Sequence, residues 1–303
     1  MKYRNLGTTG LSVSEVGMGC NRLGEAIATN AVWDSLVRRA ADLGVNLFDT
    51  SELYTEGRSE EVLGRAIGNR DDVYIATKYG SRETADGRDW SSAVMSQAIE
   101  GSLKRLRRSA IDVYQVHSPS RADLERCDWA DGMARLKKQG KIRCAAVAIG
   151  SPDDGVWLIE NELVDVLQVT YNIFVTDVEG HLLPLAKERG VGTLIRMPLA
   201  RGVLTGKFSA ADGIPTDNRA HHDGERALER LELVDTLSHV TGAYPGGITR
   251  LAMHFSLSHP GVSCIIPGAR NIAQLEQNVA ASDGANLPAQ VRVEIDRIAA
   301  SWS

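Results

Sequence analysis

The chain has 303 residues, of which 43% are apolar and 24% are charged, and its formal net charge is −5. This composition predicts a globular protein with a large core, and the negative charge argues against a nucleic-acid partner. The four scattered cysteines have no metal-binding spacing, and no apolar run could serve as a signal core or cross a bilayer. We therefore expect a cytoplasmic protein with no metal and no membrane partner.

The chain begins with a predicted β-hairpin, in which residues 3–6 and 11–14 flank a turn of small residues at 7–10. A first buried strand follows at residues 15–19. Its two glycines, Gly17 and Gly19, allow a close approach to the backbone. Arg22 holds the place of the third glycine of a GxGxxG fingerprint, so this dinucleotide-binding motif is missing.

From residue 30 onward, strand-like apolar runs alternate with segments whose apolar residues recur at helix spacing. After residues 15–19, the predicted strands are 45–48, 73–77, 111–116, 143–149, 164–170, 191–196 and 261–266. The predicted helices are 30–43, 59–67, 92–106, 124–138, 152–160, 178–188, 226–240, 247–257, 272–281 and 288–300, and an irregular segment occupies 198–223.

Eight strand–helix units with no linker between them predict a single domain over residues 1–303. The expected fold is α/β, a (β/α)8 TIM barrel with an N-terminal β-hairpin and an extra C-terminal helix. A doubly wound open sheet is the structural alternative. The missing fingerprint and the hairpin before the first strand weigh against it.

Polar residues recur where predicted strands end: Asp49, Lys78, His117 and Gln168, with Tyr54 on the loop after Asp49. In an α/β barrel these strand ends meet at the face that carries the active site. Each residue also has a structural explanation, since a lone histidine in an apolar run is usually a core residue and a lysine at a strand end is usually solvated. Their recurrence at one topological position favours chemistry.

The set makes chemical sense as a tuned proton donor. A free tyrosine has a pKa of roughly 10, and an adjacent ammonium favours the phenolate. Lys78 could supply that ammonium, and the carboxylate of Asp49 would keep it charged. His117 could bond a substrate oxygen beside the Tyr54 phenol, which then faces a carbonyl. No haem or flavin motif supplies electrons, so a bound nicotinamide is implied.

Seven ordered motifs then carry a resemblance to the aldo-keto reductase superfamily that extends over essentially the whole chain. They are GVNLFDTSELY (44–54), GRSEEVLG (57–64), IATKYG (75–80), DVYQVHSP (112–119), QVTYN (168–172), PLARGVLTGKF (198–208) and IPGARNIAQLEQN (266–278). The resemblance implies an NADP(H)-dependent oxidoreductase. Such an enzyme reduces aldehyde or ketone carbonyls, including sugar-like ones, to alcohols, and it works as a monomer or small homo-oligomer.

The resemblance also implies roles for individual residues. Tyr54 matches the proton donor, Lys78 and Asp49 the pair that tunes it, and His117 the residue that orients the carbonyl. Gln168 matches the ligand of the nicotinamide carboxamide. The implied cofactor contacts are Gly19, Cys20, Asp49, Gln168, Arg196, Pro198, Leu199, Gly202, Gly268, Ala269, Arg270, Gln274 and Asn278. Arg270, beside a helix start, suits a 2′-phosphate, so NADP is expected over NAD.

The chain departs from the family pattern at several places. Ala148 and Ile149 stand where many relatives hold the carboxamide with Ser-Asn. Arg196 stands where many stack a tyrosine on the nicotinamide, and Met197 replaces a common serine. Substrate contacts are expected near Trp90 and in residues 118–121 and 217–223.

Two other functions remain open at this stage. One is a cofactor-sensing or auxiliary subunit on the same fold with little or no turnover. The other is a barrel isomerase or aldolase in which Lys78 forms a Schiff base.

Overall fold

The computed structural model describes residues 1–80, 83–84, 87–211, 213–214, 225–237, 240, 242 and 244–300. It contains an eight-stranded sheet whose neighbouring strands all pair in parallel, in the order β12-β11-β10-β9-β8-β5-β4-β3. The strands are β3 (Met18–Gly19), β4 (Leu47–Asp49), β5 (Tyr74–Tyr79), β8 (Ile111–His117), β9 (Ile142–Ala148), β10 (Val166–Thr170), β11 (Gly192–Arg196) and β12 (Cys264–Ile265).

The sheet closes into a barrel between its first and last strands. Val16 and Gly19 form parallel bridges with Ile265 and Gly268, and the Gly19 amide donates to the Pro267 carbonyl at 3.0 Å. A Cβ on Gly19 would lie 2.7 Å from the Ile266 carbonyl oxygen, so the seam requires glycine there. The closure confirms the predicted (β/α)8 TIM barrel and excludes the doubly wound sheet.

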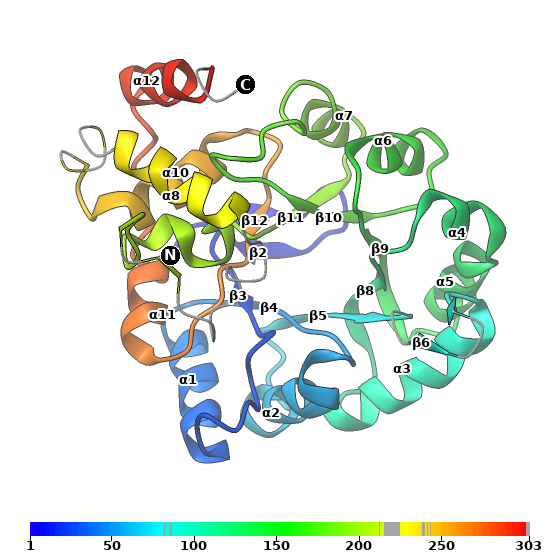
Figure 1. Ribbon diagram of the computed structural model, residues 1–303. Coiled ribbons are helices and arrows are strands. Elements are labelled where there is room, and N and C mark those ends of the chain that lie inside the picture. The colour runs from blue at the N-terminus through cyan, green and yellow to red at the C-terminus, as the bar shows by residue number, and fades with distance from the viewer. Residues whose placement is uncertain are drawn as a thin grey trace.

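Helices surround the ring of strands (Figure 1). They are α1 (Asn30–Asp42), α2 (Arg58–Ile67), α3 (Ser92–Leu106), α4 (Arg121–Arg126), α5 (Trp129–Lys138), α6 (Pro152–Glu160), α7 (Leu182–Glu188), α8 (Glu225–Thr236), α10 (Gly247–Ser258), α11 (Ile272–Val279) and α12 (Ala289–Ala299). Two 3-10 segments, η1 (Tyr54–Gly57) and η2 (Ala200–Thr205), follow β4 and β11. In the described part of the chain, no helix is long and apolar enough to cross a membrane.

The predicted N-terminal hairpin is confirmed as β1 (Tyr3–Asn5) paired antiparallel with β2 (Ser12–Ser14). Its apolar side chains Leu6, Leu11 and Val13 are buried and pack in one cluster with apolar residues of the barrel strands. That cluster includes Leu47, Ala76, Val113, Cys144, Ala146, Val166, Leu194 and Cys264. The hairpin therefore contributes to a core inside the barrel.

Two predicted helices differ from the structure, and one short strand pair was not predicted. The predicted helix 124–138 is two helices, because Cys127 is extended and Asp128 accepts hydrogen bonds from the backbone amide and hydroxyl of Ser92. The helix predicted from residue 178 begins at Leu182. The loop before α3 contains a short antiparallel pair, β6 (Glu83–Thr84) and β7 (Gly87–Arg88), that was not predicted.

Candidate active site

A cavity of about 460 Å³ opens where the barrel strands end. Tyr54 and His117 line it together with every one of the thirteen residues predicted to contact a cofactor. Lys78 is absent from the lining because its side chain is fully buried beneath Asp49 and Tyr54. The structure thus brings the two predicted groups, catalytic and cofactor-binding, to one site.

Asp49, Lys78 and Tyr54 form a continuous buried contact. The Lys78 ammonium donates to Asp49 Oδ2 at 2.7 Å and to Tyr54 Oη at 3.3 Å. Its third donor goes to the Thr50 carbonyl at 2.8 Å. Burial alone lowers the pKa of Lys78, but attraction to Asp49 and to Tyr54 outweighs it, so the pKa lies above its usual value. Lys78 is therefore charged at neutral pH, beside the phenol.

Two buried amides hold the other carboxylate oxygen of Asp49. Gln115 donates to Oδ1 at 3.0 Å and Gln168 donates to the same atom at 2.8 Å. Gln168 also donates to the Gln115 carbonyl at 3.1 Å. These bonds fix the orientation of the carboxylate. Gln115 was missed by sequence reasoning, although it lies two residues before His117 on β8 and therefore faces the same side of the strand.

His117 stands edge-on to Tyr54, with ring centroids 5.9 Å apart and planes at 85°. Burial, then the positive charges of Lys78, Arg196 and Arg88, lower the pKa of His117 to about 3, so the ring is neutral at physiological pH. Its Nδ1 lies 3.1 Å from Ser51 Oγ. We assign the hydroxyl as the donor in this bond, which places the ring proton on Nε2.

The loop that carries Tyr54 has an unusual backbone. Thr55 and Glu56 follow it with φ of +50° and +58°, in the left-handed region. For a β-branched residue such as Thr55 this conformation costs about 1–2 kcal/mol. The Thr55 hydroxyl donates to the Leu23 carbonyl at 2.6 Å, which ties the loop to the chain after β3. The strain is thus held by a tertiary contact next to the phenol.

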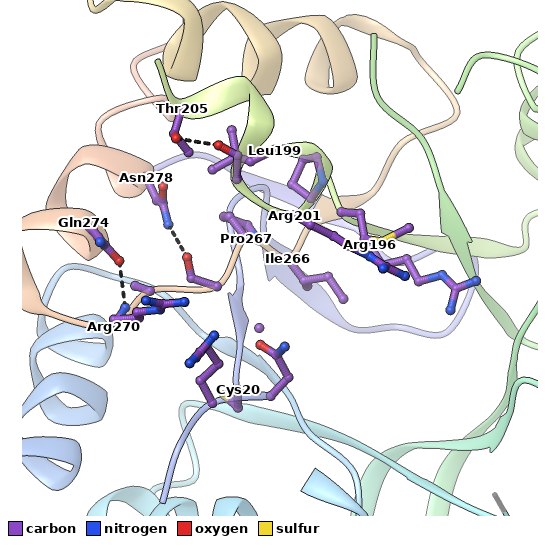
Figure 2. Close-up of a pocket in the computed structure, with 18 of the residues that line it drawn as sticks. Cys20, Arg196, Leu199, Arg201, Thr205, Ile266, Pro267, Arg270, Gln274 and Asn278 are labelled. Carbon is purple, nitrogen blue, oxygen red and sulfur yellow. Dashed lines mark hydrogen bonds between the residues drawn. The ribbon is translucent and has the colours of Figure 1, made fainter. Parts of the chain in front are cut away.

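The side of the cavity opposite Arg196 is formed by residues at the start of α11 (Figure 2). Asn271 caps this helix, and the Gln274 side chain accepts from the Arg270 amide at 2.9 Å. Asn278 donates to the Gly268 carbonyl at 3.1 Å, which fixes the strand-to-helix turn. Figure 2 shows Arg270 and Arg196 on opposite sides of this cavity.

Among the described residues that line the cavity, five are cationic and one, Asp49, is acidic. The cations are Arg22, Arg196, Arg201, Lys207 and Arg270. Sequence reasoning had assigned roles only to Arg196 and Arg270. It also missed the lining residues Asn21, Thr205, Phe208, Thr249 and Gln277. These residues come from the loop after β3, from η2 and the segment after it, and from α10 and α11, and residue spacing does not reveal that these elements meet at one wall.

The predicted substrate contacts are only partly described. Trp90 is buried, and its indole nitrogen donates to the His117 carbonyl at 3.4 Å. It therefore helps to position the backbone of His117 and does not contact the cavity. Neither Trp90 nor residues 118–121 line the cavity. Residues 217–223 lie outside the described residues.

Comparison with known proteins assigns the chain a family relationship. The model of the Aldo/keto reductase family matches residues 15–300. The holo form of an aldo-keto reductase from Bacillus halodurans superposes with a TM-score of 0.83 at 28% identity, and the match covers 98% of this chain and 96% of that one.

Two further relatives differ in what their names describe. An aldo/keto reductase from Klebsiella pneumoniae, solved in complex with NADP and acetate, has a TM-score of 0.76 at 26% identity and covers 98% of this chain and 95% of its own. A probable voltage-gated potassium channel subunit beta from Oryza sativa subsp. japonica is 32% identical over 310 residues, which are 93% of this chain and 92% of that protein.

Proposed function

The chain belongs to the aldo/keto reductase family, and from that premise we propose that it is an NADP(H)-dependent oxidoreductase. It reduces aldehyde or ketone carbonyls, including those of sugar-like substrates, to alcohols. The observation that carries the proposal is the position of Tyr54 Oη, 3.3 Å from the charged Lys78 and on the wall of a cationic cavity. The buried free thiols of Cys20, Cys144 and Cys264 suit a reducing compartment, so we place the enzyme in the cytoplasm.

The side chains divide the work of reduction. When bound, the nicotinamide supplies a hydride to the carbonyl carbon. Tyr54 gives its hydroxyl proton to the carbonyl oxygen, and the Lys78 ammonium stabilises the phenolate that is left. Asp49 keeps Lys78 charged. Neutral His117 donates from Nε2 to the same oxygen and so aligns the carbonyl. The phenolate is reprotonated from solvent.

The residues present fit a phosphate-rich cofactor. NADPH carries a pyrophosphate and a 2′-phosphate, and five cations line the cavity against one carboxylate. We assign the nicotinamide to the end with Tyr54 and Gln168, because hydride and proton must reach the same carbonyl group. Arg270, on the opposite side, then holds the 2′-phosphate, which selects NADP over NAD. The Klebsiella pneumoniae relative in complex with NADP supports this cofactor.

A Tyr54→Phe variant tests the proposal. It keeps the ring but lacks the proton, so we expect turnover of a carbonyl panel to fall at least a hundredfold, within the usual range of about 10²–10⁴ for general acid catalysis. NADPH affinity should stay unchanged. Tyr114→Phe is the matched control, because Tyr114 is buried outside the cavity and its hydroxyl has no hydrogen-bond partner among the described residues. Near-wild-type turnover in Tyr54→Phe would refute Tyr54 as the acid.

The auxiliary-subunit alternative predicts cofactor binding with no turnover of any carbonyl. The channel-subunit relative is consistent with that function. Aldo-keto reductases are also among the relatives, however, so the channel-subunit relative does not favour the auxiliary function over the reductase function. NADPH consumption followed at the nicotinamide absorbance with a panel of aldehydes, ketones and sugars separates the two.

The Schiff-base alternative conflicts with the geometry of Lys78. Its ammonium is fully buried, it does not reach the cavity, and its contacts to Asp49, Thr50 and Tyr54 use all three donors. A Schiff base needs a neutral, accessible amine, and Asp49 maintains the charged form.

A further inference from the structure

We propose that Arg196 makes this site bind the reduced nicotinamide cofactor more tightly than the oxidised one and thereby biases the enzyme toward carbonyl reduction. The inference rests on the proposed function, because it assigns a selective role to one residue of the same site. It concerns the redox state of the cofactor, which the phosphate contacts cannot distinguish.

Arg196 is fixed at the end of β11 by two hydrogen bonds to neutral acceptors. Its Nε donates to Thr170 Oγ1 at 3.0 Å, and Nη2 donates to the Ile149 carbonyl at 2.8 Å. These partners stand at the ends of the two preceding strands, so the guanidinium spans three neighbouring strand ends. The side chain is largely buried, and burial lowers the pKa of Arg196 from its usual value.

Among the described residues, Asp49 and Tyr54 attract Arg196 through space, but neither forms an ion pair with it. Within the described part of the chain, no carboxylate forms an ion pair with it, and Asp49, the one acidic lining residue, is already paired with Lys78. Among the described residues that line the cavity, the ionisable rings at this end are Tyr54 and His117, and His117 is neutral. Arg196 therefore places a positive charge at the catalytic end of the cavity, where Arg201 also acts on it through space.

This charge acts on the one part of the cofactor that changes between its redox forms. The oxidised nicotinamide ring is a cation and the reduced ring is neutral, whereas the phosphates are identical in both. Attraction of Arg22, Arg201, Lys207 and Arg270 to the phosphates thus cancels in the comparison. Repulsion between Arg196 and the oxidised ring remains. Between two unit charges within roughly 10 Å of each other, at an effective dielectric of about 20, it corresponds to at least a tenfold difference in affinity.

Direct binding titrations of NADPH and NADP⁺ to the whole protein test the proposal, with tryptophan fluorescence or calorimetry as the readout. The measured quantity is the ratio of the two dissociation constants. We expect wild type to bind NADPH at least tenfold more tightly. Arg196→Met, which keeps the apolar stem and removes the charge, should lower this ratio about tenfold, and Arg196→Lys should preserve most of it.

Arg270→Met is the matched control. It removes a cation on the opposite side of the cavity, so it should weaken both cofactors and leave their ratio unchanged. The inference is overturned if the ratio of the two dissociation constants in Arg196→Met lies within twofold of the wild-type ratio. It is also overturned if the wild-type ratio is near one, a result that does not depend on the folding of any variant. Both results leave the reductase proposal standing. Failure of wild type to bind either cofactor overturns both proposals.

Discussion

The substitution Asp49→Asn tests the charge arrangement beneath the phenol. Asp49 has one oxygen bound to the Lys78 ammonium at 2.7 Å and the other bound to the amides of Gln115 and Gln168. An asparagine has one carbonyl oxygen and one NH2 group. Whichever way it is oriented, the NH2 group faces another donor, and Lys78 loses its counter-charge in a fully buried position.

The expected cost is large. Breaking a buried ion pair by removing one partner destabilises a protein by about 3–5 kcal/mol, against a typical total stability of 5–15 kcal/mol. The surface substitution Asp72→Asn is a matched control. It removes a pair in which Arg70 donates to both Asp72 oxygens at 2.9 and 2.6 Å, and exposed pairs contribute less than about 1 kcal/mol.

Denaturant unfolding without cofactor measures both variants. We also expect the stability of Asp49→Asn relative to wild type to rise with pH below the unfolded pKa of lysine, about 10.4. Without Asp49, burial becomes the dominant influence and lowers the pKa of Lys78, so the unfolded state binds more protons. In wild type the pKa of Lys78 is raised. The contribution of charged Lys78 to stability is therefore lost only when the pH rises above the pKa of lysine in the unfolded chain. Adding Lys78→Met to Asp49→Asn should recover part of the stability.

The reasoning is wrong if Asp49→Asn lies within about 1 kcal/mol of Asp72→Asn. It is also wrong if Lys78→Met added to Asp49→Asn lowers stability further. Either result would mean that solvent or another group compensates the Lys78 charge, and that the pair does not control the ionisation of the site.

Three further predictions follow from the same structure. The pKa of His117 is about 3 in the folded chain and near 6.5 in the unfolded chain, so the stability of the protein falls as the pH drops below 6.5. Between pH 7 and 5, wild type should lose about 2 kcal/mol more stability than His117→Gln, as measured by denaturant unfolding. Arg270→Gln should weaken NADPH binding by about 10- to 100-fold and leave NADH binding unchanged in titrations, since it removes one charge-assisted contact to the 2′-phosphate. Gly19→Ala should destabilise the protein by about 1–3 kcal/mol, because the new Cβ would meet the Ile266 carbonyl at the barrel seam. Gly150→Ala is the control and should not destabilise it, because the space around Gly150 is open. Equal thermal midpoints for the two variants would contradict the role of Gly19 at the seam.

The sequence predicts the barrel and the convergence of strand ends because both depend on local signals. An apolar run that ends in a polar residue marks Asp49, Lys78 and His117 without any knowledge of their partners. The break between α4 and α5 is different, because it depends on Asp128 accepting hydrogen bonds from Ser92, 36 residues away. No local pattern contains that information, so the sequence predicts one helix over residues 124–138 where the structure has two.

The cavity wall was harder to predict than its catalytic end. Arg201 and Gly202 have φ of +57° and +107°, and this turn folds η2 over the barrel mouth. The cations Arg22, Arg201 and Lys207 reach the cavity through such loops, whose course depends on tertiary contacts. The orientation of Gln115 toward Asp49 likewise required the pairing of β5 with β8, in which Lys78 is in register with Gln115.

The neutral His117 and the proposed preference for reduced cofactor have one shared physical cause. Burial is the largest influence that lowers the pKa of His117, and the charges of Lys78 and Arg196 follow. Lys78 forms an ion pair with Asp49, whereas Arg196 is bound by two neutral acceptors and has no ion pair within the described part of the chain. A proton on His117 and a positive charge on a nicotinamide are thus opposed by the same guanidinium. Arg196→Met should therefore raise the pKa of His117 while it lowers the preference for NADPH. A His117 titration followed by NMR that matches wild type would show that Arg196 does not act on His117.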